Sequence, residues 1–192
     1  MSVTVNGEEE DEHLHERHHH HHHHTGVGEI FDMIDAMDIP DAVKSDAKAV
    51  FNLVAEAEGR VHGRPVEDIH FHELGTLDAL ADVLGVCLLL LELAPEKVFA
   101  SPVNVGSGRV RCAHGVLPVP TPATELLLRG VLVYSSGIEG ELCTPTGAAL
   151  LRHFAGEFGP LPPMRIDRTG CGTGKCDYPA ANILRAIYGE AM

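Results

Sequence analysis

Residues 66–82 constrain the fold of this chain more than any other stretch, because they place two histidines and five carboxylates among apolar side chains that need burial. In the first half of the stretch apolar and polar residues alternate, which predicts an extended run whose His70 and His72 share one face. Thr76 then suits a helix N-cap, and the apolar residues Leu77–Leu93 predict a helix. The stretch therefore predicts a strand, a turn and a helix that carry polar side chains close to a core.

The polar residues of this stretch are also candidates for chemistry. Imidazoles followed by carboxylates are ligand types for divalent transition metals and can act as acids and bases. The pattern marks His70, His72 and Glu73 as candidate catalytic residues, and His70, His72 and Asp78 as candidate metal ligands. A structural role stays open, since the helix dipole alone favours an aspartate in a first helical turn.

The charge and the apolar runs exclude two classes of partner. The 192-residue chain has 28 Asp and Glu against 14 Lys and Arg, a formal net charge of -14. Nucleic-acid binding requires a basic patch, so we expect no nucleic acid partner. The longest apolar run, residues 84–91, is too short for a membrane span, and no membrane association is expected. Five cysteines without an export signal favour reduced thiols in the cytoplasm.

Residues 1–28 differ from the rest of the chain in composition. They contain few large apolar side chains, and an acidic run in them precedes the histidines. Such a segment cannot offset the entropy cost of ordering, which predicts a disordered tail. Histidine-rich tracts bind metal ions, so the candidate metal ligands here are His18, His19, His20, His21, His22, His23 and His24. An expression tag would look similar, but the interior position and the acidic lead-in favour a native tract.

Residues 29–192 are expected to form one α+β domain, a mixed sheet with packed helices. Apolar residues at helical spacing predict a helical hairpin, with one helix before Pro40 and a second that ends near Gly59. Further helices are expected over residues 77–93, from Pro122 and after Thr144, and strands over residues 97–105, 109–115, 131–134 and 164–168. Residues 182–188 could form a strand or a short helix, and the alternation of apolar and polar residues favours a strand.

Two places suit an anionic substrate. Arg109, Arg111 and His114 gather positive character in an otherwise acidic chain. Thr144 and Thr146 stand at a predicted helix start, where backbone amides and hydroxyls can bind phosphate or carboxylate groups. These five residues are the candidate substrate-binding residues, although threonine at a helix start also serves for capping alone.

Several strings in this sequence stand in a recognisable order, at residues 61–63, 66–75, 112–115, 118–124 and 140–150. Together they resemble the nickel insertase family, which completes the nickel-pincer nucleotide cofactor of lactate racemase. The resemblance runs from about Glu12 to the end of the chain. A histidine-rich tract ahead of a helical hairpin fits this family as well.

The resemblance implies an enzyme that inserts nickel into pyridinium-3,5-bisthiocarboxylic acid mononucleotide and consumes CTP, joining the metal to a ring carbon and two sulfurs. It implies that CTP and Mg²⁺ or Mn²⁺ bind in a separate C-terminal nucleotide-binding domain or polypeptide, and it implies a homo-oligomer. The sequence departs from the family in lacking an N-terminal segment with a Ser-Gly-Ile-Ser-Gly-Asp-like string and in stopping near Tyr188, where that domain would begin. Cys171 and Cys176 also lie where other residues are expected.

Two other functions stay open. The chain could be a nickel storage or delivery module that uses mainly its histidine tract, without catalysing a reaction. It could also be a structural subunit that holds a nucleotide-binding partner. An insertase fragment could in addition be inactive alone.

Overall fold

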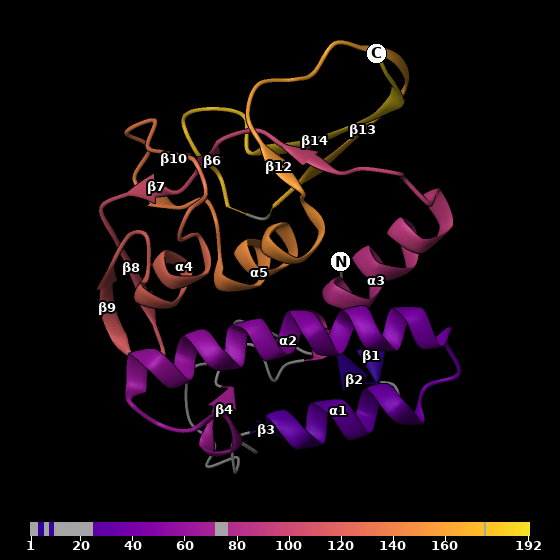
Figure 1. Ribbon diagram of the computed structural model, residues 1–192. Coiled ribbons are helices and arrows are strands. Elements are labelled where there is room, and N and C mark those ends of the chain that lie inside the picture. The colour runs from indigo at the N-terminus through magenta and orange to yellow at the C-terminus, as the bar shows by residue number, and fades with distance from the viewer. Residues whose placement is uncertain (1–3, 6–7, 10–24, 72–76, 175) are drawn as a thin grey trace.

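The computed structural model describes residues 4–5, 8–9, 25–71, 77–174 and 176–192 (Figure 1). Its helices are α1 (Val27–Ala36), α2 (Asp41–His62), α3 (Leu77–Leu93), α4 (Pro122–Leu127), α5 (Pro145–Phe154) and the short 3₁₀ helix η1 (Val66–Asp68). Its strands are β1 (Thr4–Val5), β2 (Glu8–Glu9), β3 (Thr25–Gly26), β4 (His70–Phe71), β5 (Phe99–Ala100), β6 (Val103–Asn104), β7 (Gly106–Ser107), β8 (Arg109–Cys112), β9 (Gly115–Pro118), β10 (Val133–Tyr134), β11 (Gly140–Glu141), β12 (Glu157–Phe158), β13 (Met164–Thr173) and β14 (Ile183–Ala191).

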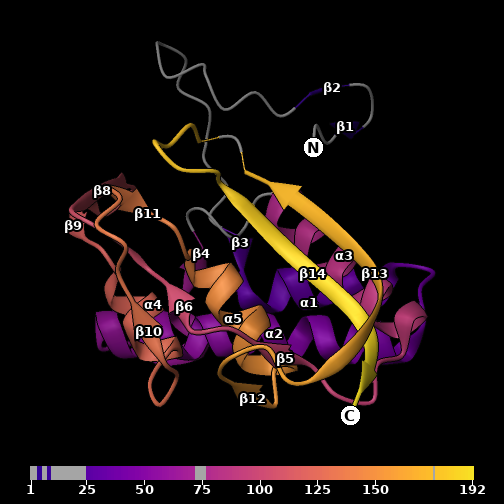
Figure 2. The ribbon, with the colours of Figure 1, turned by 90° about the horizontal axis from the view of Figure 1, so that it is seen from above.

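Helix α2 is the centre of the core. Its buried stripe includes Val50, Phe51 and Val54, which are fully enclosed. The helix packs against α1 on one side and against α3, α4 and α5 on the other (Figures 1 and 2). A salt bridge of 2.5 Å between Lys48 Nζ and Asp35 Oδ1 also joins α2 to α1. The predicted helical hairpin is confirmed, because the 3.6-residue spacing of apolar side chains makes one continuous buried face.

The predicted end of the second helix was wrong by one turn. The helix continues through Gly59 to His62, and Gly63 takes the left-handed conformation at φ 64° that commonly follows a helix. Gly59 has a packing role instead, since a Cβ there would lie 2.9 Å from the carbonyl oxygen of Arg64. The absence of a side chain lets the chain return closely over the helix. The extra turn places His62 on the helix.

The strands of the described residues form two-stranded pairs. The pairs β6–β10 and β5–β12 are parallel, and β1–β2, β3–β4, β7–β11, β8–β9 and β13–β14 are antiparallel. The α+β class is confirmed. In place of one mixed sheet, the described residues form several separate two-stranded sheets, some parallel and some antiparallel. The single strand expected over residues 97–105 is instead the two short strands β5 and β6, each with a different partner. Pro102 supplies no backbone N–H between β5 and β6, which favours an interruption.

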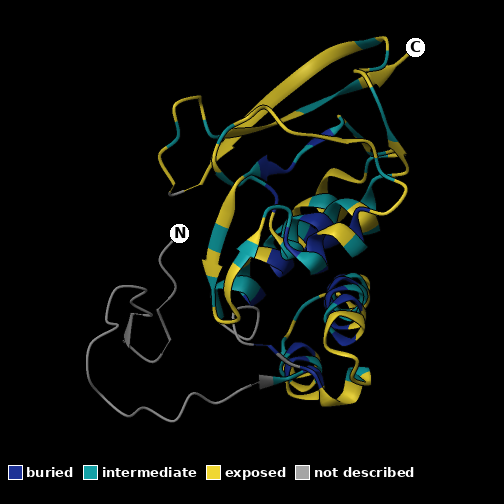
Figure 3. Cartoon of the chain, turned by 90° about the vertical axis from the view of Figure 1, so that its left-hand side faces the viewer, coloured by how far each residue is buried: buried dark blue, intermediate teal, exposed yellow. Residues whose placement is uncertain are grey.

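The two strands expected at the end of the sequence are both present and longer than predicted. β13 and β14 form an antiparallel ribbon in which most residues are exposed (Figure 3). A hydrogen bond of 3.5 Å from the hydroxyl of Tyr188 to the backbone oxygen of Leu93 links the ribbon to the end of α3. Both strands were therefore predicted correctly, β14 from its alternating sequence, although few of their side chains enter the core.

Most of the predicted N-terminal tail, including the histidines at residues 18–24, lies outside the described residues. The described part of the tail contains the β1–β2 pair. The main body begins with β3, which pairs with β4 and leads directly into α1. Among the described helices, none is long and apolar enough to cross a membrane.

Candidate functional site

Within residues 66–82, the structure describes residues 66–71 and 77–82. His70 lies in β4, where its backbone is in register with Gly26. The next residue, Phe71, is buried, with its ring centroid 6.2 Å from that of Phe51. His72 and Glu73 lie outside the described residues, and Asp78 is half-buried in the first turn of α3. Whether these candidate residues share one site therefore stays a prediction.

The candidate basic residues lie on the hairpin β8–β9. Arg109 and Arg111 are exposed on β8, opposite Pro118 and Val116 of β9. Because they are two residues apart in a strand, they point to the same face of the hairpin. His114 lies in the exposed turn between the strands. The hairpin therefore presents two guanidinium groups on one face and an imidazole at its tip.

The second candidate anion site is the start of α5. Thr144 is the N-cap residue, and its hydroxyl accepts a hydrogen bond of 3.3 Å from the backbone N–H of Gly147. Pro145 has no N–H, so two of the first positions of the helix offer no free amide to a ligand. Thr146 is half-buried in this first turn. Thr144 thus has the capping role that the sequence also allowed, and Thr146 is the better candidate for substrate contact.

One group of metal-ligand side chains is assembled among the described residues, at the end of α2. Glu58, His62 and His114 each offer a ligand atom, and these atoms all lie within 4.8 Å of one another. The distance between Glu58 Oε2 and His62 Nε2 is 3.3 Å. The rings of His62 and His114 have centroids 4.8 Å apart and planes inclined at 44°. Helix α2 supplies two members of this group and the β8–β9 turn supplies the third.

The sequence prediction included His114, as a substrate-binding residue, but missed Glu58 and His62. A signal for them existed, because residues four apart on a helix are neighbours on its surface. The predicted helix end near Gly59 concealed that signal by leaving His62 outside the helix. The approach of His114 has no local signal, since it depends on how the hairpin packs against α2.

Two of the cysteines are unsuited to metal binding at neutral pH. Burial, with a smaller contribution from Asp46, raises the pKa of Cys87 to about 11. Burial, with a smaller contribution from Glu141, raises the pKa of Cys143 to about 11 as well. A metal is bound by the thiolate rather than the thiol. Both residues act as small apolar members of the core.

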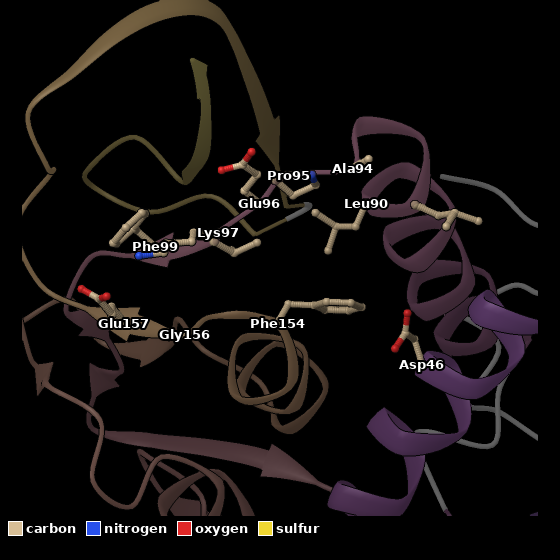
Figure 4. A pocket seen from close by; sticks show the side chains of 12 residues that line it. Asp46, Leu90, Ala94, Pro95, Glu96, Lys97, Phe99, Phe154, Gly156 and Glu157 are labelled. Atoms are coloured by element: carbon tan, nitrogen blue, oxygen red, sulfur yellow. The ribbon is translucent and has the colours of Figure 1, made fainter. Parts of the chain in front are cut away.

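A groove of about 500 Å³ lies elsewhere on the molecule, between the end of α3, the end of α5 and the segment that joins α3 to β5. Leu90 and Phe154 face each other across it, with Asp46 at one end and Lys97 and Glu157 at the other (Figure 4). None of the described residues that line it is a histidine or a cysteine. The groove is therefore not part of the metal-ligand group.

The fold and the ligand group define a class: an α+β domain with a nitrogen- and oxygen-rich set of side chains suited to a borderline divalent cation. Residues 1–192 match the family model described as nickel insertion protein. The chain belongs to the nickel insertion protein family. No solved structure matches it.

Relatives from three bacteria carry the name pyridinium-3,5-bisthiocarboxylic acid mononucleotide nickel insertion protein. The protein of Desulfitobacterium hafniense strain DSM 10664 is 47% identical over 152 residues, which are 79% of this chain and 38% of that protein. The protein of Geobacillus kaustophilus is 42% identical over 163 residues, 84% of this chain and 40% of that protein. The protein of Staphylococcus saprophyticus is 39% identical over 187 residues, 97% of this chain and 45% of that protein. The chain thus spans less than half the length of these relatives.

Proposed function

We propose that this chain is the metal-handling part of an enzyme that inserts nickel into pyridinium-3,5-bisthiocarboxylic acid mononucleotide. The observation that carries the proposal is the 47% identity, over 79% of this chain, to a relative named for that activity. The assembled imidazole and carboxylate groups support it, because such ligands suit nickel and release it to softer sulfur ligands. A cytoplasmic location and assembly into a homo-oligomer are parts of the same proposal.

The proposed roles rest on the chemistry of the candidate residues. The histidine tract at residues 18–24 gathers nickel, and His70, His72 and Glu73, with Asp78, act on it near the substrate. Arg109, Arg111 and Thr146 bind the phosphate and carboxylate groups of the mononucleotide. CTP with Mg²⁺ or Mn²⁺ binds in a further nucleotide-binding domain or polypeptide, in keeping with the greater length of the relatives.

A nickel storage or delivery module is the second candidate function, favoured by the seven consecutive histidines. Reconstitution separates the two. The chain is incubated with Ni²⁺, the mononucleotide, CTP and a polypeptide that supplies the remaining part of a relative, and the product is followed by mass spectrometry. An insertase yields a metallated mononucleotide only when this chain is present. A storage module binds nickel without increasing that yield.

Arg111→Ala is expected to weaken binding of the mononucleotide about 10- to 100-fold, because a charge-assisted hydrogen bond contributes roughly 1.5–3 kcal/mol. Thr146→Ala should weaken it less, since the lost hydroxyl is neutral. Titration calorimetry with the mononucleotide measures both effects. The control is Arg185→Ala, which removes another exposed arginine, from β14. Unchanged affinity in the Arg111 and Thr146 variants would remove both residues from the proposed substrate site.

The histidine tract is expected to bind several Ni²⁺ ions weakly at pH 7.5 and to release them near pH 5, because a protonated imidazole cannot bind metal. Calorimetry compares the full chain with one shortened to begin at Thr25, which keeps the β3–β4 pair and α1. The weak sites should disappear, while the melting temperature should stay nearly constant. Unfolding of the shortened chain would show that the tail is part of the folded domain.

A further inference from the structure

The end of helix α2 and the β8–β9 turn bring together side chains that are far apart in the chain. Glu58 and His62 occupy successive turns of one helix face, and His114 reaches them from a separate element. Glu–His neighbours at this spacing are common on helices and need no ligand. A second imidazole beside the first, unlike a Glu–His pair, does favour a bound cation. Two protonated rings would repel each other, whereas two neutral rings can both bind one cation.

The dimensions of the group fit a metal ion. Imidazole and carboxylate ligands lie about 2.0–2.2 Å from a first-row ion such as zinc, so two ligands of one ion are at most about 4.4 Å apart. The three ligand atoms are all within 4.8 Å of one another, with the Glu58–His62 pair at 3.3 Å. Small side-chain rotations would therefore complete the coordination. The side chains of Glu58 and His62 are 18% and 36% exposed, so an ion can reach them from solvent.

We propose that Glu58, His62 and His114 bind one divalent nickel ion as a three-ligand site between α2 and the β8–β9 hairpin. The choice of nickel rests on the proposed function, whereas the choice of a borderline divalent ion rests on the ligands themselves. Two nitrogens and one oxygen favour nickel, zinc, cobalt or copper over magnesium or calcium. Three protein ligands leave coordination positions for water or for a substrate atom.

The site has a mechanical consequence for the hairpin. Its third ligand stands in an exposed turn, so a bound ion ties the tip of β8–β9 to the end of α2. Strand β8, which leads into this turn, carries Arg109 and Arg111. Metal binding therefore positions the two arginines of the proposed substrate site, and it identifies the hairpin as the link between metal and mononucleotide.

Nickel binding by full-length chains tests the proposal directly. The starting chain carries asparagine in place of each histidine from His18→Asn to His24→Asn, which removes the background of the tract. Equilibrium dialysis at pH 7.5 should find one tight Ni²⁺ site per chain. His62→Ala, His114→Ala and Glu58→Gln should each weaken it at least about tenfold, since even changes outside the ligand set typically cost 10–100-fold. The control is His153→Ala, from a histidine–carboxylate pair with Asp46 that has no third ligand among the described residues.

A second measurement does not depend on affinity alone. Ni²⁺ should slow tryptic cleavage after Arg109 and Arg111 by holding the hairpin, and His62→Ala should abolish that protection although it lies on α2. Should His62→Ala fail to fold, His114→Ala in the exposed turn gives the same test. Wild-type affinity in both histidine variants, or protection that survives them, would overturn the site.

The failure of this site and the failure of the proposed function have different signatures. If His62→Ala, His114→Ala and Glu58→Gln all bind Ni²⁺ with wild-type affinity and nickel insertion still proceeds, the site is rejected and the proposed function is kept. If the three variants lose tight Ni²⁺ binding but the reconstituted system never forms metallated mononucleotide, the site is kept and the insertion function is rejected.

Discussion

Phe51→Ala is expected to lower the free energy of unfolding by about 3–5 kcal/mol, the usual cost of truncating an enclosed phenylalanine. Phe51 is 0% exposed on the central helix α2, and its ring packs against that of Phe71 from β4. Its loss would leave a cavity where the helical layer meets the strand that carries His70. Because a domain is stable by only about 5–15 kcal/mol, a substantial unfolded population is expected at moderate temperature.

Urea unfolding followed by circular dichroism measures this loss. The control is Phe99→Ala in β5, which removes the same side chain from a position that is 37% exposed. A partly exposed ring gives up less apolar burial, so the control should lose much less stability. Equal losses in the two variants would contradict the assignment of α2 as the centre of the core.

His72→Ala and Glu73→Gln are expected to abolish formation of the metallated mononucleotide in the reconstituted system while the melting temperature changes little. The reason is that the packing of this stretch comes from its neighbours in the chain, Phe71 and Leu80, which are both 4% exposed. A ligand in a cleft adds little to such packing, whereas removing a partner from a buried hydrogen bond costs about 1–3 kcal/mol.

Melting temperature and nickel insertion are therefore measured on the same variants. The matched control for the carboxylate is Glu67→Gln, an exposed glutamate in the same stretch. The control for the imidazole is His153→Ala on α5. Parallel loss of activity and stability would make His72 and Glu73 part of the scaffold, and the proposed catalytic roles would fall with that result.

In the proposed nickel insertion, the three-ligand site holds the metal and the stretch around His72 acts in the insertion step. Experiments can separate these two roles. If both hold, Glu58, His62 and His114 variants lose nickel affinity, whereas His72 and Glu73 variants keep the tight site and lose the product. Comparing binding with product formation in each variant assigns the residue to metal holding or to the insertion step.

Much of the local structure could be predicted because it depends on neighbours in the chain. The apolar spacing in α2 and α3 specifies helices whatever surrounds them, and the alternation in β14 specifies a strand. The same local rules failed at Gly59, where a residue that commonly ends helices is used for close packing against the backbone of Arg64. That choice depends on a contact, and a sequence pattern does not contain it.

The sequence by itself determined the helical hairpin, the α+β class and the family, through local periodicity and through strings of residues that stand in one order. The tertiary structure alone decided which ligands meet. The sequence marked His114 for its positive character beside Arg109 and Arg111, but only the folded arrangement of the β8–β9 turn and the last turn of α2 brings it to His62 and Glu58. The physical reason is that long-range pairing depends on the shape of a whole core, whereas helices and strands depend on a few neighbouring side chains.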